Sequence, residues 1–399
     1  MAVSELFFLF VPIVWVILTL FVLKEEFPRK FMVGWAIMVA VCLILGLMMV
    51  RGISKMMGGG GSWAEGLYYG WFLVGLFTIL QIFKKILSGV LNKLILWPAL
   101  PVRAVLIKVI YYVIIFIFVV PFFLSMTSVH RCKVGDALNP KTALGLNYED
   151  VSWKTSDGLT IKGWFIPAGS DKAVLIAHGL GANKSNFIGT VELWHRLGFN
   201  VLIFDFRGHG ESDGHTVTFG WRERLDIIGG WNYLNHVKKF TSTKIIGYGV
   251  SFGGAALIHA ANQIHGFNKL IIDSSFADLD DMAAHIIEGE PIVPVFLRGA
   301  FKEMGLFFMR VDIGFDIREK SPEKTIGDLD GTPLLFIHGK GDPLISYAQS
   351  QRLYSRAGQP KQLFILNTQG HFGTINDPTY PEIIMSFLKS GDGNKIAIP

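Results

Sequence analysis

The sequence predicts a helical membrane region followed by an α/β domain with a mostly parallel sheet flanked by helices. Two observations lead to this fold class. Residues 1–130 contain long apolar stretches, whereas the chain from residue 146 on contains short apolar, β-branched runs separated by helix-like segments. Short runs that are apolar throughout are typical of strands buried on both faces of a parallel sheet. Their alternation with helical segments is typical of an α/β domain.

The composition speaks against a chain that is soluble throughout or disordered. Of the 399 residues, 51% are hydrophobic and 17% are charged, whereas a soluble domain has about 25% charged residues. Residues 1–130 contain 10 Lys and Arg against 4 Asp and Glu, and residues 131–399 contain 27 against 28. The excess positive charge therefore lies among apolar segments. This argues against nucleic acid as a partner and in favour of a lipid bilayer.

Four apolar stretches in residues 1–130 are long enough to span a membrane, which takes about 20 residues. We expect these helices at residues 6–23, 31–50, 64–83 and 104–125. A cleaved signal peptide is the alternative for the first, but it lacks a basic start and a small-residue cleavage site. Residues 84–97 place apolar side chains at helical spacing opposite Lys and Asn, which predicts an interfacial helix. The sequence thus predicts an integral, multi-pass membrane protein.

The basic residues of the short loops predict its orientation. The loops after the first and third spans contain seven Lys and Arg, and the loop after the second contains only Arg51 and Lys55. Loops rich in Lys and Arg stay in the cytoplasm. We therefore expect both termini, and the domain after the fourth span, to lie outside the cytoplasm.

The α/β domain is expected at about residues 146–390. Residues 151–154 and 159–164 alternate between apolar and polar across Asp157-Gly158, which predicts a β-hairpin. Buried parallel strands are expected at Ala173–Ala177, Val201–Phe204, Lys244–Ile246, Leu270–Ile272, Leu334–Ile337 and Leu363–Leu366. Ligands of such sheets bind beyond the carboxyl ends of the strands. The residues directly after each strand are therefore the candidates for chemistry.

A serine follows the third of these strands in the pattern G-x-S-x-G. Ser251 stands in Gly249–Gly253, between an apolar strand and a helix of small residues, where a sharp turn can present its hydroxyl. A second match, Gly210–Gly214 around Ser212, lies in a polar loop with no helix behind it. We therefore predict Ser251 as the nucleophile.

A nucleophilic serine needs a base, and the base needs an orienting carboxylate. His371 follows the last expected strand, which is the place of the base in the chain order Ser, Asp, His. Asp342 follows the preceding strand and is the predicted acid, with Asp273 as the alternative. His338 and His209 are predicted to bond loop backbone rather than to act as the base.

Backbone N–H groups are needed to stabilise the oxyanion of the tetrahedral intermediate. Phe252 follows the nucleophile directly and would supply one of them. Leu180, in the glycine-containing turn after the strand that ends at Ala177, would supply the other. The alternative is that this His178-Gly179 turn is an ordinary strand-to-helix connection.

Five segments in this order, HGLGANKSNF, DFRGHGESDG, GYGVSFGG, HGKGDPLI and QGH, resemble the motifs of the α/β-hydrolase superfamily. They are most similar to membrane-anchored abhydrolase-domain serine hydrolases, which include acyl-protein thioesterases (depalmitoylases). The resemblance covers about residues 146–390. It implies the α/β-hydrolase fold, the triad Ser251, Asp342 and His371, and esterase-type chemistry. It does not cover residues 1–130, and such relatives are generally held by one span or by a lipid.

Residues 276–330 are expected to form a helical cap, because about 60 residues between two strands far exceed the usual 2–6. The segment contains the apolar runs 291–297 and 304–309. We expect its inner face, with Met304, Phe307 and Phe308, to bind a lipid-like acyl group, and flexible Met side chains suit such a pocket. The alternative is that these side chains only pack on the sheet.

The predicted function is the hydrolysis of an ester or thioester, of an acylated lipid or protein, through an acyl-enzyme on Ser251. This chemistry needs no metal and no organic cofactor. A serine peptidase of the same fold is one alternative, and a catalytically silent binding or scaffold protein is another. The fold alone does not identify the substrate.

Overall fold

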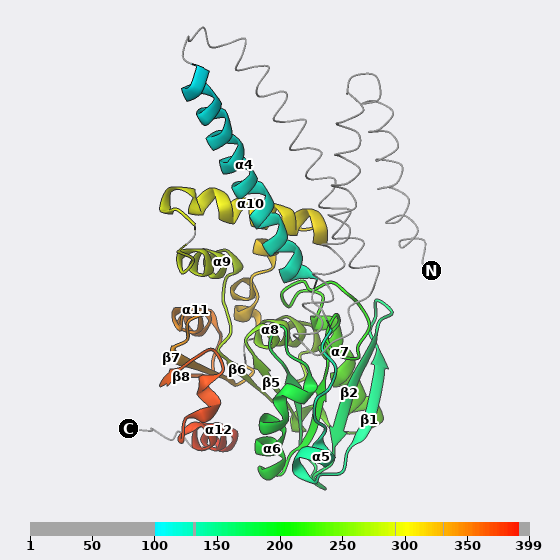
Figure 1. Ribbon diagram of the computed structural model, residues 1–399. Helices are drawn as coiled ribbons and strands as arrows, with labels where there is room; N and C mark the ends of the chain where they lie inside the picture. Colours follow the sequence, from blue (N-terminus) through cyan, green and yellow to red (C-terminus); the bar gives the residue numbers. More distant parts are fainter. Residues whose placement is uncertain (1–99, 131–132, 292, 330, 391–399) are drawn as a thin grey trace. The chain divides into compact units, whose positions relative to one another are not determined.

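The structure, a computed structural model, describes residues 100–130, 133–291, 293–329 and 331–390 (Figure 1). The chain divides into two compact units, Met1–Val120 and Pro121–Pro399. The first three predicted spans and the predicted interfacial helix lie outside the described residues, and the fourth span falls on helix α4 (Leu100–Val129). Among the described residues, no helix is long and apolar enough to cross a membrane. The four-span region stays a prediction.

One sheet of eight strands, counted within the described residues, forms the centre of the second unit. Its strand order is β1-β2-β4-β3-β5-β6-β7-β8. The strands are β1 (Glu149–Lys154), β2 (Thr160–Ile166), β3 (Ala173–Ala177), β4 (Asn200–Phe204), β5 (Ile245–Val250), β6 (Lys269–Asp273), β7 (Leu334–Gly341) and β8 (Lys361–Gln369). Strands β1 and β2 pair antiparallel, β2 joins β4 antiparallel, and the other neighbours are parallel. The predicted hairpin and all six predicted parallel strands are confirmed.

Helices cover both faces of this sheet, which is why its central strands are apolar on both sides. Along β3, Leu175 faces one cluster of buried side chains and Ile176 faces the other. The first cluster includes residues of α7 (Arg224–Asn232), α8 (Phe252–Ile264) and α11 (Ala348–Arg356). The second includes residues of α6 (Ile188–Arg196) and α12 (Tyr380–Lys389) (Figure 1). The short helix α5 (Pro140–Leu144) precedes β1 and is capped by Asn139.

A helical insertion separates β6 from β7, where the sequence predicts a cap. It contains α9 (Leu279–Glu288), α10 (Arg298–Ile313) and several short 3₁₀ turns. Leu306 and Ile313 of α10 pack in one apolar cluster with Val129 from the end of α4 and with Ala255 of α8. The insertion is thus anchored both to the helix that precedes the domain and to the helix that follows β5.

Candidate active site

Ser251 sits on a strained turn between β5 and α8. Its backbone has φ 55° and ψ −121°, a conformation that a non-glycine residue rarely adopts. Two glycines allow the backbone to approach closely on either side of this turn. A Cβ on Gly249 would lie 2.7 Å from the carbonyl oxygen of Gly253, and a Cβ on Gly253 would overlap the carbonyl of Ala177. The G-x-S-x-G pattern is therefore needed for close backbone approach on both sides of the serine.

The turn brings Ser251 into a hydrogen-bonded relay with two residues from other strands. His371 Nε2 lies 2.8 Å from Ser251 Oγ, and His371 Nδ1 lies 2.7 Å from Asp342 Oδ2. His371 comes just after β8, and Asp342 directly after β7. The structure thus brings together all three residues that the sequence predicts as a triad. In this arrangement His371 can accept the Ser251 proton while Asp342 holds the imidazole in place.

Asp342 is held as a carboxylate by hydrogen bonds on both oxygens. The N–H groups of Leu344 and Ile345 donate to Oδ1 at 2.9 and 3.0 Å. Burial alone would raise the pKa of Asp342, but the hydrogen bonds from His338, His371 and Ile345 outweigh it and keep the pKa well below its usual range. The acid of the relay therefore stays ionised at any physiological pH.

The two predicted oxyanion donors flank this serine. Phe252 is the first residue of α8, so its N–H is among the donors that an α-helix leaves without an intrahelical acceptor. The helix dipole there also favours a developing negative charge. Leu180 follows Gly179, at which a Cβ would lie 3.7 Å from Ser251 Cβ. Both predicted donors therefore belong to backbone segments that adjoin the nucleophile.

Two buried histidines fix the turn that contains Leu180. His178 Nδ1 donates to the carbonyl of Gly179 at 2.8 Å, and His178 Nε2 accepts from the N–H of Phe206. His209 Nε2 accepts from the N–H of Gly181 at 3.2 Å. Both rings therefore hold backbone, as the sequence predicts for His209.

The sequence profile of the Alpha/beta hydrolase family matches residues 174–381, more than half of the chain, and these contain the whole relay. The chain belongs to the alpha/beta hydrolase family. It is 32% identical to the uncharacterized protein YqkD of Bacillus subtilis over 244 residues, which cover 58% of this hydrolase and 76% of YqkD. It is 26% identical to the alpha/beta hydrolase domain-containing protein WAV2 of Arabidopsis thaliana, covering 54% of this chain and 68% of WAV2.

Among solved structures, the hydrolase resembles the esterase Pf2001 of Pyrococcus furiosus. The two share 27% of their residues at a TM-score of 0.57, and the match covers 66% of this chain and 97% of the esterase. The α/β-hydrolase fold with a mostly parallel sheet and flanking helices is therefore confirmed.

The two alternative residues weighed in the sequence have other surroundings. Ser212 is fully buried, where its hydroxyl donates to the carbonyl of Asp205 and accepts from the N–H of Lys162 at 2.9 Å. Asp273 lies at the end of β6 and accepts hydrogen bonds from the hydroxyls of Tyr380 at 2.7 Å and Thr374 at 2.9 Å. Both are therefore held in hydrogen bonds outside the relay.

The three cap residues predicted to bind substrate differ in exposure along α10. Met304 and Phe308 are half-buried, whereas Phe307 is 54% exposed. The ring of Phe308 packs edge-on against Phe122 of α4, with 5.1 Å between the ring centroids. Phe308 therefore has a packing role, whatever it contributes to substrate binding.

Three carboxylates near the Leu180 turn have the spacing of metal ligands, but a lysine lies among them. Asp136, Asp205 and Glu211 bring their oxygens within 4.8 Å of one another. Lys184 Nζ lies 2.5 Å from Asp136, 2.7 Å from Asp205 and 2.8 Å from Glu211. Burial would lower the pKa of Lys184, but these ion pairs outweigh it and raise the pKa. The ammonium group thus occupies the place that a metal ion would take.

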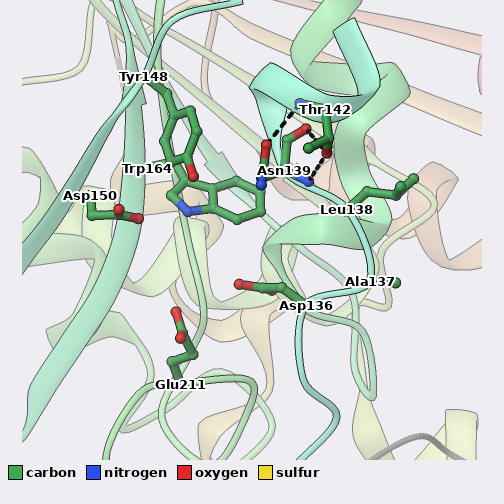
Figure 2. Close-up of a pocket in the computed structure, with 9 residues that line it drawn as sticks. All are labelled: Asp136, Ala137, Leu138, Asn139, Thr142, Tyr148, Asp150, Trp164 and Glu211. Carbon is green, nitrogen blue, oxygen red and sulfur yellow. Dashed lines mark hydrogen bonds between the residues drawn. The ribbon is translucent and has the colours of Figure 1, made fainter.

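Figure 2 shows the pocket of about 280 Å³ beside this ion-pair cluster. Its lining is mostly polar and is formed by Asp136, Ala137, Leu138, Asn139, Thr142, Tyr148, Asp150, Trp164 and Glu211. Lys184 and this cluster were not predicted from the sequence, because the four side chains come from three segments that are distant in the chain. The signal that could have found them is position, since Lys184 follows the turn after β3 and Asp205 follows β4 directly.

Proposed function

We propose that this α/β hydrolase is a serine hydrolase that cleaves carboxylic esters or thioesters through an acyl-enzyme on Ser251. The observation that supports it is the relay from Ser251 Oγ to His371 Nε2, at 2.8 Å, and from His371 Nδ1 to Asp342, at 2.7 Å. The similarity to the Pyrococcus furiosus esterase agrees with ester substrates.

The steps follow from the positions of these groups. Ser251 Oγ attacks the acyl carbonyl carbon as its proton passes to His371 Nε2, and the oxyanion accepts hydrogen bonds from the N–H groups of Leu180 and Phe252. The imidazolium of His371 then protonates the leaving alcohol or thiol, and the acyl group stays on Ser251. A water molecule then gives a proton to His371 and attacks the acyl carbon, the bond between Ser251 Oγ and the acyl carbon breaks, and His371 returns the proton to Oγ as the acid is released. Asp342 stays ionised throughout.

Labelling with a fluorophosphonate probe tests the nucleophile without knowledge of the substrate. The wild-type chain and a Ser212→Ala variant should both be labelled, because Ser212 is bonded to backbone. Ser251→Ala should not be labelled. Labelling of Ser251→Ala at the wild-type rate would show that another residue is the nucleophile, and an unlabelled wild type would favour a silent binding protein.

Turnover of a series of esters, thioesters and amides with one common acyl group measures which leaving group the enzyme prefers. We expect turnover of the ester and thioester and little of the amide, because an amine is a poorer leaving group than an alcohol or a thiol. Preferred turnover of the amide would support the peptidase alternative. A thioester preference would support the likeness to acyl-protein thioesterases.

We propose further that the cap makes the enzyme selective for lipid-like acyl groups. The support is the apolar side chain of Phe307, which is 54% exposed on α10 beside half-buried Met304 and Phe308. Phe307→Ala should lower kcat/KM for long-chain esters more than for acetyl esters. Val311→Ala, at a 65% exposed position of the same helix, is the matched control. Equal losses on both substrates would mean that Phe307 only packs.

The location proposed for this enzyme is a membrane, with the catalytic domain outside the cytoplasm. Its support is the four apolar stretches and the excess of Lys and Arg in the first and third loops. Protease added to intact cells should degrade the domain. Full protection in intact cells, followed by cleavage after lysis, would reverse the orientation, and recovery of the chain in the soluble fraction would contradict the membrane location.

A further inference from the structure

A second histidine contacts the acid of the relay. His338, on β7, is fully buried, and its Nε2 lies 3.3 Å from Asp342 Oδ2. The same oxygen accepts the 2.7 Å hydrogen bond from His371 Nδ1. Two imidazole rings therefore share one carboxylate oxygen.

The neighbours of His338 determine which of its nitrogens carries a proton. Nε2 lies 2.9 Å from the carbonyl oxygen of Ile345 as well as near Asp342. Both of these partners can only accept, so Nε2 must be protonated. Nδ1 lies 2.7 Å from the hydroxyl of Ser350, which can either donate to a neutral ring or accept from a charged one. In both protonation states, the Nε2–H of His338 faces Asp342.

We infer that His338 is a positioning residue that acts through Asp342 to set the basicity of His371. This rests on the proposed function of the relay. A donor on Oδ2 stabilises the carboxylate charge and so weakens its attraction for the proton of His371. The N–H groups of Leu344 and Ile345 hold Oδ1, and His338 in turn holds the carbonyl of Ile345. The pH dependence of the reaction reports the electrostatic contribution of His338, which a purely structural role would not change.

The other ionisable groups around His338 do not change the direction of the effect. Asp273, on the neighbouring strand β6, is the second carboxylate that interacts with it: burial raises the pKa of Asp273, and hydroxyl hydrogen bonds and His338 act against the rise. Tyr248 and Tyr380 approach Asp273 with neutral hydroxyls. Loss of His338 would leave the two carboxylates less compensated, and either one would then favour a protonated His371.

The experiment measures the rate of fluorophosphonate labelling of the full-length protein against pH. The rate requires neutral His371, so its acid limb reports how readily that ring gives up its proton. His338→Leu should move the midpoint of this limb upward by about 0.5 pH unit or more, the size expected when a charged hydrogen bond is lost. His338→Gln should stay near the wild type, because its amide can donate to Asp342 and accept from Ser350.

Two further variants keep the test decisive. Ser350→Ala removes the partner of Nδ1 and should move the midpoint in the same direction, which covers the case that His338→Leu does not fold. His259→Leu is the matched control, because His259 is also buried but bonds the carbonyl of Lys320 at 3.0 Å; it should leave the midpoint unchanged.

The outcomes separate this inference from the proposed function. A wild type that is labelled at Ser251, with an unchanged midpoint in His338→Leu and Ser350→Ala, overturns the role of His338 alone. An equal upward shift in His259→Leu, or no rescue by His338→Gln, also overturns it. A wild type that is not labelled at Ser251 instead contradicts the proposed function.

Discussion

Gly253 of α8 lies directly against the carbonyl of Ala177 at the end of β3. A Cβ on Gly253 would also lie 2.5 Å from the carbonyl oxygen of His178, and real Cβ atoms do not approach backbone so closely. The turn that carries Leu180 begins at these carbonyls. The helix with the nucleophile and the turn with the predicted oxyanion donor are therefore in contact through a residue without a side chain.

Gly253→Ala should therefore lower activity severely, because the added methyl must push α8 away from β3. We expect at least a 100-fold loss of kcat for ester hydrolysis, as for other displacements of about 1 Å in an active site. Gly189→Ala, in the exposed part of α6 with nothing within 4 Å of the new Cβ, should instead stabilise the chain by about 0.5–1 kcal/mol. Steady-state kinetics and thermal unfolding of both variants measure these effects, and near-normal activity of Gly253→Ala would contradict the tight contact.

Asp342→Asn should lower kcat by about 10⁴-fold, because an amide favours the wrong tautomer of the base. Asp273→Asn should cost far less, since its carboxylate accepts from hydroxyls that can rotate to satisfy an amide. The comparison uses kcat of both variants on one ester at one pH. A larger loss in Asp273→Asn would reverse the choice of acid.

The sequence was informative about strands and about the order of the relay, because both depend on local patterns. Runs such as Ala173–Ala177 are apolar on both sides since helices cover both faces of the sheet. Ser251 was distinguishable from Ser212 because only the former stands between a strand and a helix.

Contacts between separate segments could not be predicted in the same way. His338 and Asp342 are four residues apart, a spacing that indicates a shared face only in a helix, yet here a strand end and a tight turn bring them together. Lysines are mostly exposed in proteins, but Lys184 is 1% exposed and neutralised by carboxylates from two other segments. Such pairs depend on tertiary structure alone.

The stability of the domain should fall with pH below about 6.5 because of a buried histidine. Burial lowers the pKa of His259 to about 4, whereas in the unfolded chain this ring has its ordinary pKa of about 6.5. Between these two values the ring is neutral in the folded chain and protonated in the unfolded chain. The stability from keeping this ring neutral is present above pH 6.5 and is lost as the pH falls toward 4, by about 3 kcal/mol in total. Burial lowers the pKa of His178 as well and adds to the same slope.

Thermal unfolding of the full-length protein between pH 7 and 4.5 measures this slope. His259→Gln keeps a donor for the carbonyl of Lys320 but cannot titrate, so its melting temperature should fall less steeply with pH than that of the wild type. Parallel pH dependences of the two proteins would show that His259 is protonated in the folded state.

Loss of the ion pair between Arg207 and Asp226 should strongly destabilise the folded domain. Arg207 is 3% exposed and Asp226 is fully buried, and Nε and Nη2 of Arg207 donate to Asp226 Oδ1 at 3.0 and 2.8 Å. The same guanidinium binds Asp157 in the turn between β1 and β2. Arg207→Met would leave Asp226 buried without its partner, which costs about 3–5 kcal/mol of unfolding free energy.

The pH dependence of that loss distinguishes an unpaired carboxylate from a simple packing defect. Burial raises the pKa of Asp226, and Arg207 acts against the rise, so in Arg207→Met the carboxyl should take up a proton far above the ordinary pKa of about 3.9. A group with a raised folded pKa stabilises the fold fully below its unfolded pKa, and this stability is lost as the pH rises. Denaturation of Arg207→Met against the wild type should therefore show a deficit that grows as the pH rises above about 7, the pKa to which burial raises Asp226 in the wild type. The double variant with Asp226→Leu should show a smaller deficit with no such growth, and a deficit independent of pH in the single variant would mean that Asp226 never titrates in the folded chain.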